Sequence, residues 1–151
     1  MKLFSQMTVI LVTAGLFSTN VQAVDVLAVC GGSNGYSYFP ERGLVPVGKG
    51  GWQKDQISSG TITFIRTDEG KVDLIYKTAA GVTTSPSQEG GNVATLYEDT
   101  ERLVVLSFFQ GVVTETFYLN KTNQELLWNQ IKYNSQVEKA AAFVSNCGPG
   151  K

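Results

Sequence analysis

Apolar and polar residues alternate along several short segments of the chain, which is the pattern of β-strands with one buried face. In residues 71–77, three apolar side chains fall on one face and the charged side chains fall on the other. Residues 61–67 show the same alternation. Only the short, glycine-containing segment 68–70 separates these two runs, so they predict a β-hairpin.

The same spacing continues toward the C-terminus, with strand patterns at 92–98, 103–109, 112–119 and 125–133. Short segments rich in Gly, Asn or charged residues separate them. Strands that recur at intervals of about ten residues with turns between them are typical of antiparallel all-β domains. We therefore predict a mainly β fold, an antiparallel meander that forms a small barrel or a sandwich, with at most one short helix near the C-terminus.

Two segments fit either a helix or a strand. Residues 122–125 match a helix capping box, but the preceding loop has hairpin length, so we favour a strand over 125–132. Residues 135–138 also match a capping box, and the strong helix formers of 139–142 follow. For residues 136–146 a short helix and a final strand paired with residues 24–30 both remain open.

Residues 78–91 have no apolar period and consist mainly of small and polar side chains. We predict a mobile loop, because segments of this length without regular structure are either disordered or functional.

The first residues have the order of a secretory signal peptide: Lys2, an apolar stretch, and Val21 and Ala23 before the expected cleavage point. A membrane anchor is the alternative, but the apolar stretch is shorter than the roughly 20 residues that span a bilayer. A lipobox ending at Cys30 is a second alternative, disfavoured by the bulky Val29. We predict a signal peptide over 1–23, one β-rich domain over 24–151 without a membrane span, and a periplasmic or secreted protein.

The chain has two cysteines, Cys30 and Cys147, near the two ends of the predicted domain. Disulfides persist in the oxidising compartments that exported proteins reach. We expect these cysteines to form a disulfide that ties the ends together. The other interpretation, a redox pair, lacks the C-x-x-C spacing.

Composition excludes several kinds of chemistry. The chain has no histidine, 12 basic and 13 acidic residues, and a net charge of −1. Histidine-dependent nucleophilic catalysis is therefore absent, and no positive field would hold nucleic acid. Residues 43–50 resemble a phosphate-binding loop but lack the final Ser or Thr, so we interpret them as a glycine-rich loop. We predict no metal and no cofactor, and we lean toward a protein that is not an enzyme.

Three aromatic residues with a polar ring atom, Tyr36, Tyr38 and Trp52, lie among glycines and prolines after Cys30. Such rings offer a large contact area with a polar end, so these residues are the candidate ligand-binding side chains. The alternative is that this segment plugs one end of the sheet. The glycines of residues 31–35 predict a sharp turn beside the disulfide, with anion binding as the alternative.

The opening C-x-x-S-x-G-x-x-Y-F-P of residues 30–40, the G-W-x-K-D-x-I-S of residues 51–58 and the late Cys147 go together. In these motifs the chain resembles a group of small secreted proteobacterial proteins that has no assigned activity. The resemblance implies an exported bacterial protein and adds no catalytic residue.

The sequence thus favours a non-enzymatic binding module for an unknown small molecule or protein. An inhibitor that inserts a loop into a secreted hydrolase is one alternative. A hydrolase with paired carboxylates is another, and it would need two acids to converge in a cleft.

Overall fold

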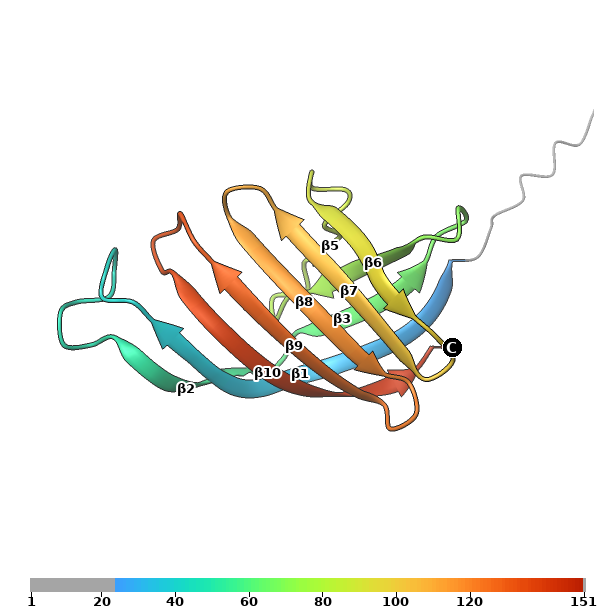
Figure 1. Cartoon of the computed structure of the whole chain (residues 1–151), viewed down its shortest axis with the longest axis horizontal. Helices are drawn as coiled ribbons and strands as arrows, with labels where there is room; N and C mark the ends of the chain where they lie inside the picture. The colour runs from blue at the N-terminus through green and yellow to red at the C-terminus, as the bar shows by residue number, and fades with distance from the viewer. Residues whose placement is uncertain (1–23, 151) are drawn as a thin grey trace, which may run out of the picture.

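The long first strand lies within the sheet, and the other strands extend the sheet from its two edges (Figure 1). The computed structural model describes residues 24–150, among which there are ten strands and no helix. The strands are β1 (Asp25–Phe39), β2 (Gly51–Ile57), β3 (Thr61–Arg66), β4 (Val72–Lys77), β5 (Thr83–Thr84), β6 (Asn92–Glu98), β7 (Arg102–Phe109), β8 (Val113–Asn120), β9 (Glu125–Lys132) and β10 (Lys139–Pro149).

All pairings are antiparallel, and the sheet order is β5-β4-β3-β1-β10-β9-β8-β7-β6. The first half of β1 pairs with β3 and its second half pairs with β2, along the same edge. The other edge of β1 pairs with the last strand, β10. The chain is therefore a meander, as predicted, and its first and last strands meet, which the sequence had left open.

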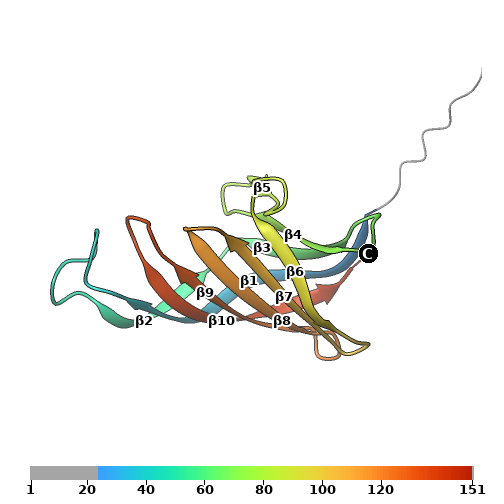
Figure 2. The same cartoon turned by 45° about the horizontal axis from the view of Figure 1, so that its top comes forward.

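The sheet curls into a half-barrel, with β6 passing in front of β3 and β4 (Figure 2). Its concave face holds the hydrophobic core, including Phe64, Leu74, Phe117 and Trp128. An ion pair from Arg66 on β3 to Glu98 on β6 links the two arms of the curl, with 2.5 Å between Nη2 and Oε1. Lys121 also approaches the Glu98 carboxylate.

The strands predicted at 61–67, 71–77, 92–98, 103–109, 112–119 and 125–133 are all present, with ends that differ by a few residues. The strand favoured over a helix at 125–132 is β9. The segment for which helix and strand remained open is β10, a strand that pairs with β1 and β9. Inward-facing Ala141, Phe143 and Ser145 are buried there, because the alternation of a strand suits a sheet with one covered face.

The glycines of residues 31–35 do not form the predicted turn. They lie inside β1, where the register shifts between Cys30 and Ser33. A Cβ at Gly35 would stand 2.0 Å from the carbonyl oxygen of Ala142 on β10, and a Cβ at Gly32 would stand 2.6 Å from that of Ile57. These glycines therefore allow backbones to approach closely, which is their usual role within a strand.

Residues 78–91 are not the structureless loop that was predicted. They contain β5, which pairs with β4, followed by a turn in which the side chain of Pro86 is fully buried. Ser85 donates a hydrogen bond to Asp73 on β4 at 2.9 Å. A single buried proline among small polar residues leaves no periodic pattern, so alternation does not detect this segment.

The disulfide between Cys30 and Cys147 is present and joins β1 to β10 across a sequence separation of 117 residues. It ties the two ends of the domain together, as expected. The predicted signal peptide, residues 1–23, lies outside the described residues. Within 24–150 there is no helix of the length and hydropathy that a bilayer crossing requires.

Candidate functional site

A row of polar side chains crosses the concave face at one level of the half-barrel. Ser107 on β7, Glu115 on β8 and Gln130 on β9 are neighbours in the strand register. Glu115 alternates in phase with Phe117 and Leu119, so the pleat of β8 turns all three side chains inward. An ionisable carboxyl group that is only 8% exposed thus takes a position that alternation assigns to the core.

Two neutral donors hold the Glu115 carboxylate. The Tyr76 hydroxyl, from β4, donates to Oε2 at 2.8 Å, and the Gln130 amide donates to Oε1 at 2.6 Å. Ser107 lies opposite Glu115 in the register of β7 and β8, but its buried Oγ has no hydrogen-bond partner among the described residues. Two hydrogen bonds therefore orient the Glu115 carboxylate, and neither of them comes from a charged group.

Burial dominates the protonation of this pair. Desolvation raises the pKa of Glu115 above its ordinary value, although hydrogen bonds from Tyr76 and Gln130 and the charge of Lys139 lower it in part. Burial, followed by the neighbouring Glu115 charge, also raises the pKa of Tyr76, which keeps the phenol protonated and able to donate. The surrounding groups thus compensate only part of the free energy that burial of the Glu115 charge costs.

The Glu115 carboxyl group opens onto a cavity of about 480 Å³ between β2, β3, β4 and the inner face of β8 and β9. Most of the exposed area of its wall is apolar, although many of the lining residues carry a polar group. The residues that line the cavity include Ile57, Ile62, Tyr76, Glu115, Trp128 and Gln130. Ligand cavities commonly have this volume and this mixture of an apolar wall with a few convergent polar groups.

A stack of aromatic rings forms the rigid wall behind the cavity. Phe117 stacks on Trp128 with 5.7 Å between centroids, and Trp128 stacks on Phe143 at 4.5 Å. The Trp128 indole nitrogen donates to Ser33 at 3.1 Å, so its ring plane is fixed. A ligand in the cavity would therefore meet a Trp128 side chain of defined orientation.

A second polar cluster fixes β2 beside the cavity. Ser37 donates to Asp55 at 2.6 Å, and the Lys139 ammonium lies 2.8 Å from the same carboxylate oxygen. Burial opposes ionisation of Asp55, but hydrogen bonds from Lys139 and Ser37 outweigh it and hold the pKa of Asp55 below its ordinary value. The cluster links β1, β2 and β10, and within it the Lys139 ammonium is paired with the Asp55 carboxylate.

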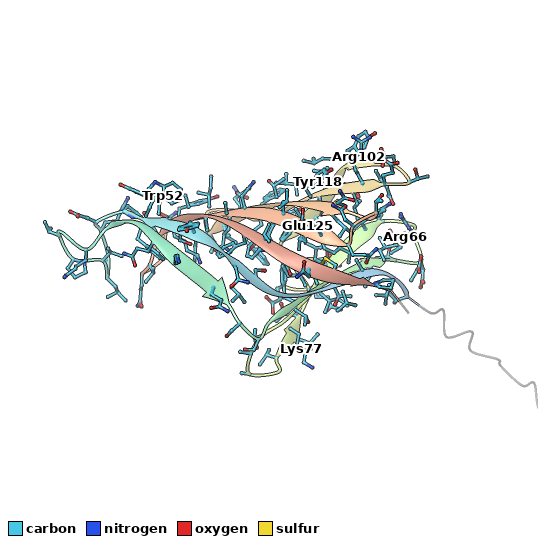
Figure 3. All side chains as sticks on the ribbon, turned by 90° about the horizontal axis from the view of Figure 1, so that it is seen from below. Trp52, Arg66, Lys77, Arg102, Tyr118 and Glu125 are labelled. Atoms are coloured by element: carbon cyan, nitrogen blue, oxygen red, sulfur yellow. A yellow bond between two sulfur atoms is a disulfide. The ribbon has the colours of Figure 1, made fainter. Side chains whose placement is uncertain are left out.

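The predicted ligand-binding residues Tyr36, Tyr38 and Trp52 do come together, but not at the cavity. Tyr38 and Trp52 are paired across β1 and β2, with ring centroids 5.6 Å apart in an edge-to-face contact. The three side chains are 53%, 42% and 68% exposed, so they do not plug the sheet. Trp52 lies on the hairpin that projects away from Arg66 and Arg102 (Figure 3). Their role in binding stays a prediction.

Sequence reasoning missed Glu115, which was not among the candidate residues. The signal was present, because Glu115 shares its alternation phase with Phe117 and Leu119. Other acids cluster at 68–69 and 98–101, where they lie at the ends of hairpins and outside the cavity. Among residues 24–150, no three His, Cys, Asp or Glu side chains gather where they could hold a metal ion.

Comparison with protein families, with curated proteins and with solved structures finds no match. The resemblance to secreted proteobacterial proteins therefore stays a prediction.

The raised pKa of Glu115 predicts a pH dependence of stability. The folded protein binds this proton more tightly than the unfolded chain, so Glu115 lowers the free energy of unfolding as the pH rises from about 4.3 through its folded pKa. Glu115→Gln keeps the shape and removes the titration. We expect the difference in unfolding free energy, variant minus wild type, to grow between pH 4 and pH 8 in urea denaturation.

Tyr76 and Lys139, the other titratable groups facing Glu115, are present in both proteins. Glu101→Gln, which removes a carboxylate at an exposed position, is the control. A pH-dependent difference for Glu115→Gln no larger than that for Glu101→Gln would contradict the burial of the Glu115 charge.

Proposed function

We propose that this protein is an exported, non-enzymatic binding module that holds a small molecule in the cavity on the concave face of its half-barrel. The observation that carries the proposal is the buried Glu115 carboxyl group, held by Tyr76 and Gln130 at the wall of a cavity of about 480 Å³. A carboxylate at a core position costs stability, and such departures from local rules concentrate at functional sites.

Export is part of the proposal. A disulfide is stable in the periplasm or outside the cell, and Cys30–Cys147 is formed. The signal-peptide pattern of residues 1–23 and the resemblance to secreted proteobacterial proteins support the same location. A binding module in either place would meet small molecules that diffuse from the surroundings.

Neither alternative class accounts for the cavity. Among the described residues that line it, Glu115 is the only acid, whereas hydrolysis by paired carboxylates needs a second. An inhibitor that inserts a loop needs no internal cavity. The exposed Tyr38–Trp52 pair on the projecting hairpin is the feature that would serve a protein partner.

The neutral apolar dye N-phenyl-1-naphthylamine tests the proposal. The chain has two tryptophans, so a Trp52→Phe variant leaves Trp128, at the cavity wall, as the only indole fluorophore. We expect saturable quenching of Trp128 emission together with enhanced dye emission, because energy transfer requires the dye to lie close to this ring.

The matched control is Trp128→Phe, in which only the exposed Trp52 remains. It should bind the dye with much weaker energy transfer. Quenching of Trp52 alone, or no saturable binding in either variant, would overturn the proposal.

A further inference from the structure

A lone carboxylate facing an apolar cavity selects a ligand by charge. Resting on the proposed function, we propose that the cavity binds a small organic cation, a protonated amine with a compact apolar body, whose ammonium group lies against Glu115. The carboxylate would thereby acquire the charged partner that the folded chain does not supply within hydrogen-bond distance.

The Glu115 oxygens have room for this partner. Each carboxylate oxygen can accept two hydrogen bonds, and Glu115 receives one at Oε2 from Tyr76 and one at Oε1 from Gln130. Both donors are neutral, so they orient the carboxylate without compensating its charge. An ammonium group donates up to three hydrogen bonds and would use the acceptor positions that remain.

The walls beside Glu115 suit the same ligand. Tyr76 lines the cavity, and the face of an aromatic ring attracts a cation through the ring quadrupole, whereas the faces of Trp128 are covered by Phe117 and Phe143. The isoleucines Ile57 and Ile62 provide an apolar surface for the rest of the molecule. Charge recognition at one end and an apolar wall at the other define an amphipathic monoamine.

A metal ion fits this site less well. Calcium takes six to eight oxygen ligands and magnesium needs octahedral coordination. No cluster of three candidate ligands exists among residues 24–150, and Gln130 turns its amide nitrogen, not its oxygen, toward Glu115. One carboxylate with two neutral donors matches a singly charged organic group.

The basic side chains near the cavity do not neutralise Glu115 directly. Lys139 is paired with Asp55 at 2.8 Å, and its ammonium lies 5.2 Å from the centre of the Phe143 ring. Lys77 lies exposed at the rim of the cavity. The Glu115 carboxylate therefore has no cationic partner within hydrogen-bond distance among the described residues, and one ammonium group would supply it.

The test compares three probes that share a phenyl body: 2-phenylethylamine, 2-phenylethanol and phenylacetate. Each displaces N-phenyl-1-naphthylamine from the Trp52→Phe protein at pH 7. We expect the amine to compete at a concentration about tenfold below that of the alcohol, a difference of about 1.4 kcal/mol, because only the amine forms a charge pair with Glu115. Phenylacetate should compete most weakly.

Glu115→Gln should remove the advantage of the amine over the alcohol. Glu101→Gln removes the same charge at an exposed position and should retain the advantage. Tyr76→Phe keeps the carboxylate and the ring and should retain most of it. Circular dichroism and the Trp128 emission spectrum establish that each variant is folded.

The outcomes separate the two proposals. If the dye binds at Trp128 but the three probes compete equally, or Glu115→Gln leaves the amine unaffected, the preference for a cation is wrong and the binding function stands. If neither the dye nor any probe binds, both proposals are wrong. Tighter competition by the amine that depends on Glu115 supports both.

Discussion

Replacing Cys30 and Cys147 together by serine is expected to lower the free energy of unfolding by about 2–5 kcal/mol. The bond closes a loop of 117 residues, and a cross-link of that span removes many conformations from the unfolded chain. It also joins β1 to β10 at the place where the first and last strands of the meander pair. Urea denaturation of the purified variant at pH 7 measures the loss.

Wild-type protein unfolded in the presence of a reducing agent is the control, and it should lose a similar amount without any substitution. A loss below about 1 kcal/mol in both experiments would show that strand pairing alone holds the termini together.

Gly35→Ala is expected to destabilise the protein by about 3 kcal/mol or to prevent folding, at the upper end of what overpacking costs. The added Cβ would stand 2.0 Å from the carbonyl oxygen of Ala142 and 2.9 Å from the Cα of Phe143. Both are backbone atoms of β10, so no side-chain rotation relieves the clash. Thermal unfolding followed by circular dichroism measures the effect.

Gly148→Ala is the matched control, because it lies on the same strand pair and a Cβ there meets no atom within 4 Å. It should change stability by less than about 0.5 kcal/mol, as expected for a substitution away from special features. Equal stability of the two variants would contradict the close approach of β1 and β10 at Gly35.

The strands from β3 to β9, apart from the two-residue β5, could be predicted because each is short and is bounded by turn residues, and most of them also have one buried face. In β4, Val72, Leu74 and Tyr76 share one phase of the alternation, and the structure buries this side more than the other. The curl of the sheet could not be predicted in this way, because alternation describes one strand at a time. It depends on contacts between distant strands, such as Arg66 with Glu98.

The part of the first strand that follows Cys30 escaped prediction for a physical reason. Glycine usually weakens a strand, so residues 31–35 indicate a turn. Here Gly35 is required because β10 passes so close, and β10 lies more than a hundred residues later in the chain. A local pattern does not contain that information.

The candidate site divides in the same manner. The position of Glu115 on the inner face follows from its phase with Phe117, and its contact with Gln130 follows from the β8–β9 hairpin. Tyr76 comes from β4, 39 residues earlier, and reaches Glu115 only because the sheet curls. Tyr38 and Trp52 are close in sequence and do meet, yet which face they occupy depends on the register of β1.

The central claim is that the cavity beside Glu115, and not the exposed aromatic hairpin, is the binding site. A two-dimensional ¹H–¹⁵N NMR titration with 2-phenylethylamine tests it directly, since each tryptophan indole gives its own signal. We predict that the Trp128 indole and the Gln130 side-chain amide signals shift in a saturable manner while the Trp52 indole stays in place. A shift of the Trp52 indole together with Tyr36 and Tyr38, with Trp128 and Gln130 unchanged, would contradict the account.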